Sequence, residues 1–548
     1  MALKHVALTV VSASLAVLMT WPLGRVSHAI VPASDDAYFS IWRLAWVAHQ
    51  LSEDPARLFD ANIFHPATNT LALSDAMMLV GVFGTPLFRA GVNPAIIHNY
   101  LLLAAIVTSM LCAFALARRL SGSDAASWLA AIVFGLAPYR MAHIGHLELQ
   151  WTMWMPLGLL LLHRLLERPT PWRGVLLGAA LAAQMLCSIY YGVFLACYLA
   201  AAWLALVPFE RAKGRIVAAS AFAIAPLLLV GLIYGPPYAR TSAQVGERRA
   251  DEVKAYSAVP GDYLRVPQEN VLRGRVDQGE APDERSLFPG FIAIGLAIVA
   301  FIPPLALRSA KREGGSSRIA FTYLGLAVLS ADLSFGTNGV LFSLLQNVFG
   351  VASLRAPARF GVLVLLSVAV LAAIGAARVY ERRPRLAPFV SVALTLLCLG
   401  EYWSSPIGVR EFDPAPTEAE AWLARHAPGT VLLELPAPAP DMLWRHEAKY
   451  QLRSIFHWQP LVNGYSAFPP RAYIALITEL RKFPQFDAIL ALRERGVKYI
   501  LVHREFYEAE EFDRLMQAIE ESTRVTAVRI FGENGKRVVV VELNYDPE

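Results

Sequence analysis

The chain has 548 residues, of which 56% are hydrophobic and only 17% are charged, and its mean hydropathy is +0.43. Soluble domains carry about 25% charged residues, so this composition is typical of a membrane protein. The formal net charge of +5 is small for this length and argues against a nucleic acid as partner. All four cysteines lie in apolar runs without metal-ligand spacing, which favours small core residues over a disulfide framework.

Apolar runs predict an α-helical polytopic protein with about eleven transmembrane helices, since a span needs roughly 17–25 residues. The first run is too long for the apolar region of a signal peptide, about 7–15 residues, and we interpret it as a span. The stretch 76–91 is short and interrupted by Gly and Pro, so a re-entrant or interfacial element is as consistent as a span. The predicted spans lie near 5–24, 95–117, 124–140, 151–166, 173–189, 191–208, 215–235, 288–306, 318–334, 359–378 and 386–403.

Basic residues orient these spans, because short loops rich in Lys and Arg remain in the cytoplasm. Five such connections fall on one side if 76–91 does not cross and Lys4 is inside. The sequence therefore predicts a multi-pass protein of a bacterial inner membrane, with its N-terminus in the cytoplasm. The long segments that would then lie outside are 25–94, 236–287, 335–358 and the tail from about 404.

The tail, 404–548, is more polar than the rest and carries strand patterns. Buried strands are predicted at 429–436 and 497–503, with a helix before the second that ends at Gly496. "VTAVRIFGENGKRVVVVEL" is typical of a hairpin that turns between Gly532 and Gly535. We therefore expect a transmembrane catalytic domain at 1–403 and an extracytoplasmic α/β domain at 404–548.

Two adjacent carboxylates, Asp35 and Asp36, follow the first span in "SHAIVPASDDAYFSIWRLAW". One of them is explained as the N-cap of a helix that opens at Ala37. A helix needs only one capping side chain, so the second carboxylate is not explained in this way. Ionisable groups at the mouth of a helix bundle are candidate functional groups, because their burial is costly. Tyr38 and the tryptophans after it share one helical face, as in a helix lying on the membrane surface or in an interfacial aromatic belt.

A second polar group lies in the predicted outer turn 137–151, "APYRMAHIGHLELQW". Its side chains suit hydrogen bonds to a sugar or a pyrophosphate, and ordinary interfacial polarity is the alternative. His146 and Glu148, with Asp36, also offer nitrogen and oxygen ligands for Mg²⁺ or Mn²⁺, although their spacing matches no metal motif. The candidate substrate-binding residues of this turn are Arg140, His143, His146 and Glu148.

Two outer arginines, Arg355 and Arg359, are predicted to share one helical face at the entrance of the span at 359–378. Paired guanidiniums bind phosphate in a bidentate manner, and snorkelling to lipid headgroups is the alternative. The polar loop 236–287, which contains Arg285, is expected to be a mobile flap or a passive connector. In the tail, "HWQPLVNGYSAFPP" (457–470) offers His457, Asn463 and Tyr465 for carbohydrate contacts, or serves as a packing loop.

This layout resembles the GT-C class of integral-membrane glycosyltransferases, which includes protein mannosyltransferases, arabinosyltransferases and oligosaccharyltransferase subunits. "SDDAYF" after the first span is similar to the paired-aspartate form of the acidic motif in that class. The resemblance implies that Asp35 and Asp36 are the catalytic base and a substrate ligand. It also implies a polyprenyl-phosphate-linked sugar as donor and a glycan, lipid or protein of the cell envelope as acceptor. The oligosaccharyltransferase signature "WWDYG" is absent from the sequence, so that activity is not expected.

Two other functions are consistent with about eleven spans. A transporter or flippase of envelope precursors would place ionisable groups or broken helices at the membrane midplane and would show paired halves. A non-catalytic protein of envelope assembly would tolerate loss of both aspartates. Because the ionisable residues gather outside the spans and no repeat is visible, we favour the glycosyltransferase.

Overall fold

The computed structural model describes residues 2–25, 30–208, 213–245, 250–274, 278–279, 281–302, 310–345, 354–439, 442, 445–532 and 537–544. The chain divides into two compact units. The first unit comprises Met1–Ala33, Ile96–Leu232 and Glu247–Glu411; the second comprises Ser34–Ala95, Ile233–Gly246 and Phe412–Glu548. Most of the first outer loop thus belongs to the same unit as the tail, whereas we expected it to belong with the membrane helices.

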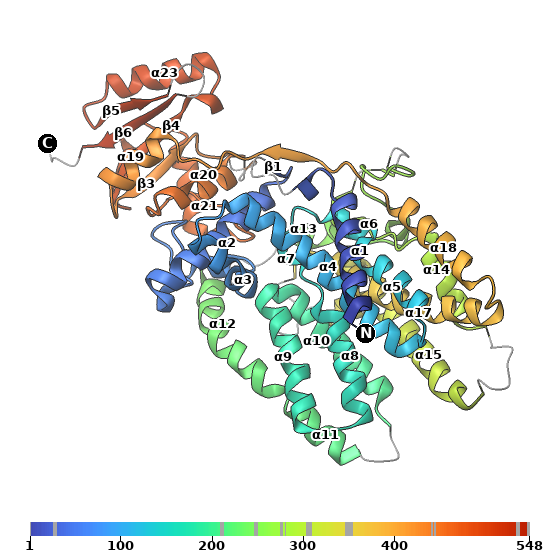
Figure 1. Ribbon diagram of the computed structural model, residues 1–548. Helices are drawn as coiled ribbons and strands as arrows, with labels where there is room; N and C mark the ends of the chain where they lie inside the picture. Colours follow the sequence, from blue (N-terminus) through green and yellow to red (C-terminus); the bar gives the residue numbers. More distant parts are fainter. Residues whose placement is uncertain are drawn as a thin grey trace. The chain divides into compact units, whose positions relative to one another are not determined.

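The first unit is built from apolar helices, and one lies in each run predicted to span (Figure 1). Among the described residues, five helical stretches are long and apolar enough to cross a membrane: Pro94–Ser121, Asp124–Ala142, Ile189–Leu206, Gly214–Gln244 and Pro357–Arg382. The helices are α1 (Ala2–Met19), α4 (Pro94–Ser121), α5 (Asp124–Leu136), α8 (Trp154–Glu167), α9 (Pro171–Cys187), α10 (Ile189–Leu206), α11 (Lys213–Ala221), α12 (Ile224–Gln244), α14 (Phe291–Val299), α15 (Ala310–Ser334), α17 (Gly361–Arg382) and α18 (Ala387–Tyr402).

Several apolar helices are shorter than the runs that predicted them. With a rise of about 1.5 Å per residue, a helix of fourteen residues such as α8 is roughly 21 Å long, short of a hydrocarbon core of about 30 Å. The membrane character of the protein is confirmed by the five long helices. The larger count of about eleven spans stays a prediction.

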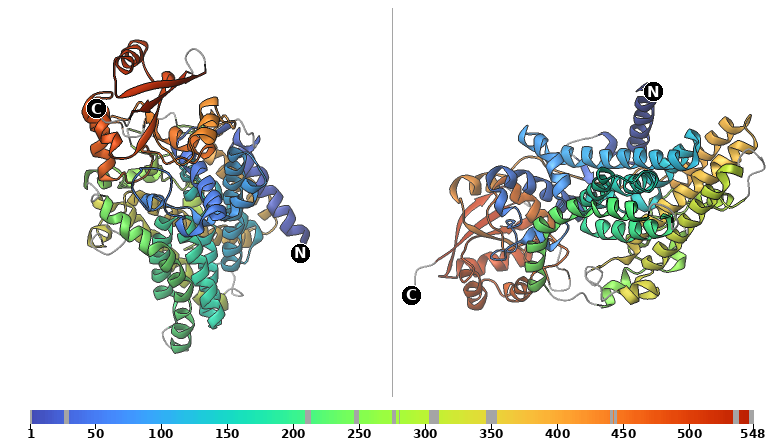
Figure 2. Two further views of the ribbon diagram at one scale, coloured as in Figure 1. Left: turned by 90° about the vertical axis from the view of Figure 1, so that its left-hand side faces the viewer. Right: turned by 90° about the horizontal axis from the view of Figure 1, so that it is seen from below.

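Close helix packing holds the first unit together. Helices α8, α9 and α10 run side by side in Figures 1 and 2, and α17 packs against α5, α14 and α15. Gly174 and Gly178 bring α9 against the chain at the end of α11, because a Cβ at either position would collide with the carbonyl oxygen of Ala219 or Ala223. Small residues four apart commonly allow such contacts between membrane helices.

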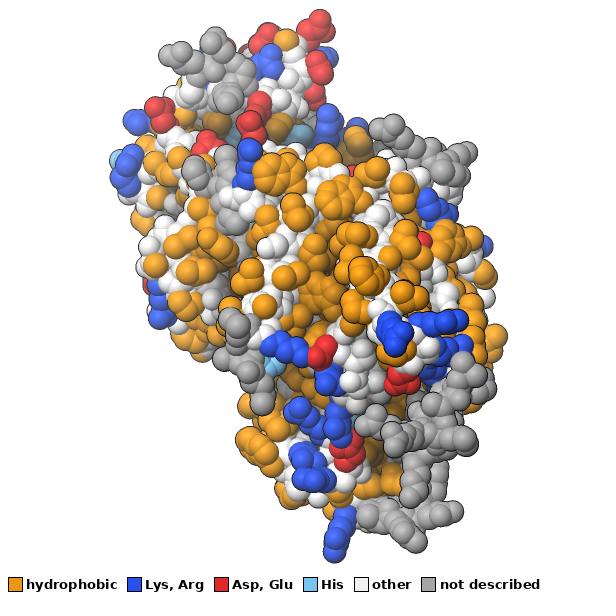
Figure 3. All heavy atoms as spheres, turned by 45° about the vertical axis from the view of Figure 1, so that its right-hand side comes forward, with side chains coloured by type: hydrophobic (Ala, Val, Ile, Leu, Met, Phe, Trp, Pro, Cys, Tyr) orange, Lys and Arg blue, Asp and Glu red, His pale blue; other side chains and the backbone are white. Residues whose placement is uncertain are grey.

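The outer surface of the helices is apolar. Large side chains such as Leu232, Phe389 and Leu396 are 75%, 75% and 63% exposed. Figure 3 shows a broad hydrophobic surface on one face of the molecule, with Lys and Arg side chains gathered towards one end. Monomeric soluble proteins rarely expose continuous apolar surface of this extent, which agrees with a lipid environment.

A four-stranded sheet organises the tail within the second unit. Its strands are β3 (Val431–Leu435), β4 (Val497–His503), β5 (Val525–Phe531) and β6 (Val538–Leu543), in the order β3-β4-β6-β5. β3 and β4 are parallel, and the other two pairs are antiparallel. Helices in this region are α19 (Glu418–His426), α20 (Glu447–Arg453), α21 (Arg471–Leu480), α22 (Phe486–Arg493) and α23 (Ala509–Glu520).

The predicted strands at 429–436 and 497–503 and the predicted hairpin are therefore confirmed. The predicted stop of the helix before β4 is also confirmed, because α22 is followed by Gly496 at φ +70°, a conformation that suits glycine. Gly532 follows β5, and the remainder of the predicted turn, 533–536, lies outside the described residues.

Helix α2 (Asp35–Glu53) belongs to the second unit and is not a membrane-surface helix. Trp42 is fully buried and Trp46 is 5% exposed. The Trp42 indole donates to Asn62, and Trp46 lies edge-on to Trp458. The prediction was wrong because protein and not lipid covers this aromatic face. The stretch 76–91 forms α3 (Met78–Arg89), whose twelve residues are too few to span a bilayer.

Candidate functional site

Helix α2 begins at Asp35, two residues before the predicted start at Ala37, so Asp35 and Asp36 lie in its first turn. The Ser34 side chain caps the helix by accepting a hydrogen bond of 3.2 Å from the Asp36 amide. Capping therefore needs neither carboxylate, and both are only partly buried. Negative charge is stabilised at a helix N-terminus, so this position suits two acidic side chains.

Tyr465 from the tail binds Asp36 within the second unit. Its hydroxyl donates to Asp36 Oδ1 at 3.2 Å, and its ring lies edge-on to Phe39 with centroids 5.3 Å apart. The structure thus brings together two of the residues that the sequence singled out, although they are 429 positions apart.

Arg43 is a neighbour of this site that the sequence analysis missed. Its guanidinium is 1% exposed, lies 4.2 Å from the Phe39 ring centroid, and donates to the Asp75 carbonyl at 2.8 Å and to Ser40 Oγ at 3.1 Å. Asp36, Ser40 and Arg43 follow the i, i+4, i+7 spacing of one helical face. That spacing was visible in the sequence and could have marked Arg43.

The other candidate residues of the tail loop have packing partners. Asn463 is fully buried; its Nδ2 donates to the Glu434 carbonyl and to Glu447, and its Oδ1 accepts from the Glu434 amide. His457 is 7% exposed and accepts from the Gln459 amide. Burial lowers the pKa of His457 to about 3, so its imidazole is neutral. These contacts fit the alternative that the loop is a packing element.

The turn 137–151 of the first unit is mostly buried, and its candidate residues Arg140 and His143 are each 1% exposed. It contains short helices α6 (Pro138–Ala142) and α7 (Leu147–Gln150). Arg140, 1% exposed, donates to Thr152 Oγ1 and to the Gln150 carbonyl, while Gln150 returns bonds to the carbonyls of Arg140 and His143. These exchanges pair several polar groups of the turn, whereas Arg140 Nε, His143 Nε2 and Gln150 Oε1 are buried without a hydrogen bond among the described residues.

Glu284 joins this buried region and was not among the predicted residues. Its carboxylate lies 3.3 Å from the Arg359 guanidinium, and the Tyr139 hydroxyl donates to the Arg359 carbonyl. Burial raises the pKa of Glu284, but Arg359, His146 and His143 outweigh that effect and hold it below its usual value, at about 2. Glu284 is therefore ionised and neutralises Arg359. No local pattern in the sequence marked this partner.

Arg355 and Arg359 do not share a helical face. Arg355 precedes the turn η8 (Pro357–Phe360), which contains Arg359, and α17 begins only at Gly361. Pro357 explains the difference, since proline disfavours helix at the residue before it. Arg355 lies 2.9 Å from Glu252 and donates to the Tyr256 hydroxyl at 2.8 Å. The side chain of Arg355 is 35% exposed, against 12% for Arg359, so Arg355 is the more accessible cation.

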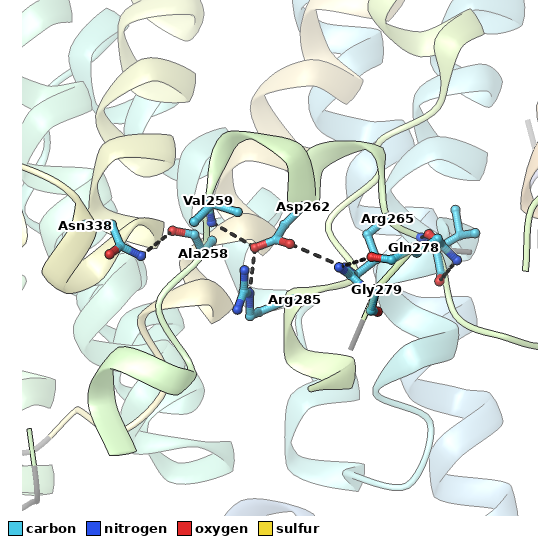
Figure 4. Close-up of polar contacts among 9 residues, drawn as sticks. Ala258, Val259, Asp262, Arg265, Gln278, Gly279, Arg285 and Asn338 are labelled. Carbon is cyan, nitrogen blue, oxygen red and sulfur yellow. Dashed lines mark hydrogen bonds and ion pairs between the residues drawn. The ribbon is translucent and has the colours of Figure 1, made fainter. Parts of the chain in front are cut away.

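Arg285 is an anchor of the loop 236–287. Figure 4 shows it converging with Arg265 on the buried carboxylate of Asp262. The distances from Asp262 are 2.7 Å to Arg285 and 3.4 Å to Arg265, and the carboxylate also accepts from the Val259 amide. Arg265 in turn donates to the carbonyls of Gln278 and Gly279. The described part of the loop is thus held by ion pairs, which fits a fixed connector better than a mobile flap.

His146 and Glu148 lie 3.5 Å apart in the first unit, while Asp36 belongs to the second. Within the residues that the structure describes, no group of three or more His, Cys, Asp or Glu side chains is placed to hold a metal ion. Binding of Mg²⁺ or Mn²⁺ by this ligand set stays a prediction.

Known structures resemble the whole chain. The arabinofuranosyltransferase AftD from Mycobacteria matches with a TM-score of 0.67 and 16% identity, over 99% of this chain and 40% of AftD. The oligosaccharyltransferase AglB from Archaeoglobus fulgidus, solved with an inhibitory peptide and a dolichol-phosphate, matches with a TM-score of 0.51 and 14% identity, over 98% of this chain and 74% of AglB. The protein therefore has the fold of the GT-C glycosyltransferases.

This chain spans well under half the length of AftD, and at these identities the likeness shows the fold alone. No curated protein matches the sequence. A family model described as "Domain of unknown function (DUF6311)" matches residues 9–399. Since this match covers most of the chain, including the helices of the first unit, the protein belongs to the family described as Domain of unknown function (DUF6311).

Proposed function

We propose that this protein is a membrane glycosyltransferase that moves a hexosyl or pentosyl group from a polyprenyl-phosphate donor to a glycan, lipid or protein acceptor on the outer face of an inner membrane. The observation that carries the proposal is the partly exposed Asp35–Asp36 pair in the first turn of α2, in a chain with the GT-C fold. The dolichol-phosphate in the AglB complex supports a lipid-phosphate donor.

Asp36 is the general base in this proposal. It removes the proton from an acceptor hydroxyl as the hydroxyl oxygen attacks the anomeric carbon, and the bond from that carbon to the phosphate oxygen breaks. The leaving group is the lipid phosphate, which keeps the electron pair. Asp36 is favoured over Asp35 because the Tyr465 hydroxyl binds it and fixes its orientation.

Arg355 of the first unit is a proposed contact for a lipid phosphate. Its ion pair with Glu252 is partly exposed, and such pairs contribute only about 0–1 kcal/mol, so a phosphate can replace the carboxylate. Arg359 is the less suitable cation because buried Glu284 already neutralises it. Binding of a divalent cation is also part of the proposal, and the proton transfer to Asp36 does not require one.

Transfer of radiolabelled sugar in proteoliposomes tests the proposal. Wild type, Asp35→Asn, Asp36→Asn and Arg355→Gln would be supplied with a panel of polyprenyl-phosphate sugars, with and without EDTA. Glu510→Gln, an exposed change in α23, is the matched control for loss of a carboxylate. We expect transfer by wild type and the control and its loss in Asp36→Asn. If both aspartate variants transfer sugar as well as wild type, neither aspartate is the base. If wild type transfers sugar from none of the donors, the transporter is favoured.

A further inference from the structure

Helix α20 of the second unit presents two buried side chains to the loop that carries Tyr465. Glu447 and Gln451 are both fully buried, and they lie four residues apart, on one face of this short helix. The hydrogen bonds shown for both side chains reach the loop residues 463–465. Their connection to the Asp36 carboxylate runs through the loop.

The contacts are with three consecutive loop residues. Glu447 accepts from Asn463 Nδ2 at 3.1 Å with one oxygen and from the Gly464 amide at 2.8 Å with the other. Gln451 accepts from the Tyr465 amide at 2.6 Å. Successive backbone amides are thus bound by side chains from successive turns of α20, which fixes the position and direction of the loop.

The opposite side of the loop is also constrained. The Asn463 carbonyl accepts from the Phe64 amide at 3.0 Å, and a Cβ on Gly464 would lie 2.8 Å from the Phe64 ring. With α20 on one side and Phe64 on the other, Tyr465 has little freedom to move. Its hydroxyl reaches Asp36 because the backbone is held on both sides.

We propose that Glu447 and Gln451 are positioning residues, which hold the 463–465 loop so that the Tyr465 hydroxyl orients Asp36 for proton transfer. This inference rests on the proposed role of Asp36 as base. A carboxylate suits position 447, because both of its oxygens accept hydrogen bonds, from Asn463 Nδ2 and from the Gly464 amide. A glutamine amide would point its own NH₂ group at one of these two donors. Burial raises the pKa of Glu447 to about 7, which shows that the charged form of this side chain is costly to desolvate.

The test combines kinetics with chemical labelling of the full-length protein in lipid nanodiscs. The variants are Glu447→Gln, Tyr465→Phe and their combination, with Glu510→Gln as the control. Tyr465→Phe keeps the ring beside Phe39 and removes only the hydroxyl. A hydrogen bond to a charged group corresponds to about a tenfold change, so we expect kcat to fall about tenfold in each single variant with KM unchanged.

The double variant separates positioning from general stability. If Glu447 acts through the Tyr465 hydroxyl, the double variant loses no more activity than the worse single variant. Fully additive losses would overturn the inference. Gln451→Met removes the acceptor for the Tyr465 amide and serves as a second variant if Glu447→Gln does not fold; it is expected to lower kcat in the same way.

The labelling arm does not depend on activity. The rate at which a water-soluble carbodiimide modifies Asp36 at fixed pH is quantified by mass spectrometry. We expect this rate to rise severalfold in Tyr465→Phe and in Glu447→Gln, because the carboxylate loses its partner. A rate in Glu447→Gln equal to that of wild type would overturn the inference. Full activity of Asp36→Asn would instead overturn the proposed function, while the labelling would still decide whether Glu447 positions Asp36.

Discussion

Gly464 shows how a single residue constrains the candidate site. It lies against the ring of Phe64, which itself has a φ of +57°, and a Cβ added at Gly464 would lie 2.8 Å from that ring. The sequence analysis singled out the stretch around it. The steric reason appears only once Phe64, 400 residues earlier in the chain, is placed beside it.

We expect Gly464→Ala to destabilise the second unit by about 1–3 kcal/mol, the usual range for overpacking. The added methyl group must displace Phe64 or the loop, so sugar transfer should fall as well. Thermal unfolding in nanodiscs and the transfer assay measure the two effects. Gly400→Ala in α18, where a Cβ meets open space, is the control. An unchanged unfolding temperature in Gly464→Ala would contradict the steric argument.

Glu447 gives the second unit a defined dependence on pH. Burial, with Glu434 nearby, raises its pKa from 4.5 to about 7, although Asn463, Gly464 and Tyr473 oppose the shift. A carboxyl with a raised pKa in the folded state stabilises that state fully below about pH 4.5 and loses its contribution as the pH rises through 7. The change is at most about 3 kcal/mol.

Unfolding temperatures measured between pH 4.5 and 8 test this dependence. Stability should fall with rising pH in wild type and in Glu510→Gln, and the fall should be smaller in Glu447→Gln. A slope in Glu447→Gln equal to that of wild type would assign the effect to another group.

At the scale of elements, apolar periodicity predicted where helices and strands form. Helices formed at the apolar runs and strands at the predicted stretches, because both depend on patterns within ten to twenty residues. The aromatic face of α2 was predicted to meet lipid, since the same amphipathic pattern suits a membrane surface and a protein core. Arg140 was predicted as a substrate contact in an outer turn, but in the structure it is buried and exchanges hydrogen bonds with Gln150 of the same turn.

Helix α9 supplies a prediction at this scale. Gly178→Leu should force α9 away from the end of α11, because its first side-chain atom already collides with the Ala223 carbonyl. We expect a lower yield of folded protein and a lower unfolding temperature. Gly231→Leu in α12, where a Cβ has no neighbour within 4 Å, adds the same side chain without a collision and is the control. Equal behaviour of the two variants would show that the approach of α9 is not required.

At the scale of the whole molecule, the orientation in the membrane remains to be measured. Charge bias predicts that the connection near Arg168 is cytoplasmic and the tail is outside. In a variant without the four native cysteines, Glu510→Cys should react with an impermeant maleimide in intact spheroplasts. Arg168→Cys should react only after the membrane is opened. The reverse pattern would invert the topology and remove the outer-face acceptor from the proposed reaction.

The candidate site was only partly predictable from the sequence. Asp35, Asp36 and Tyr465 were singled out by residue type and by resemblance. The pairing of Asp36 with Tyr465 joins positions 429 apart, and no pattern of local period contains that information. Glu284 was missed because a single ionisable residue acquires its meaning from partners that only the fold supplies. Arg43 was missed although its helical spacing from Asp36 was visible in the sequence.

The second unit also has a consequence for biosynthesis. Asn62 donates to Ser454, which is 392 residues further along the chain, and the aromatic face of α2 meets Trp458 just after it. At about 5–20 residues per second, the ribosome needs roughly 20–80 s to make the intervening chain. During that interval the early segment has been synthesised and lacks the partners that complete its fold. Helix α2 therefore cannot reach its final packing until translation has passed Trp458, and a chain that stops before residue 454 lacks these partners of α2.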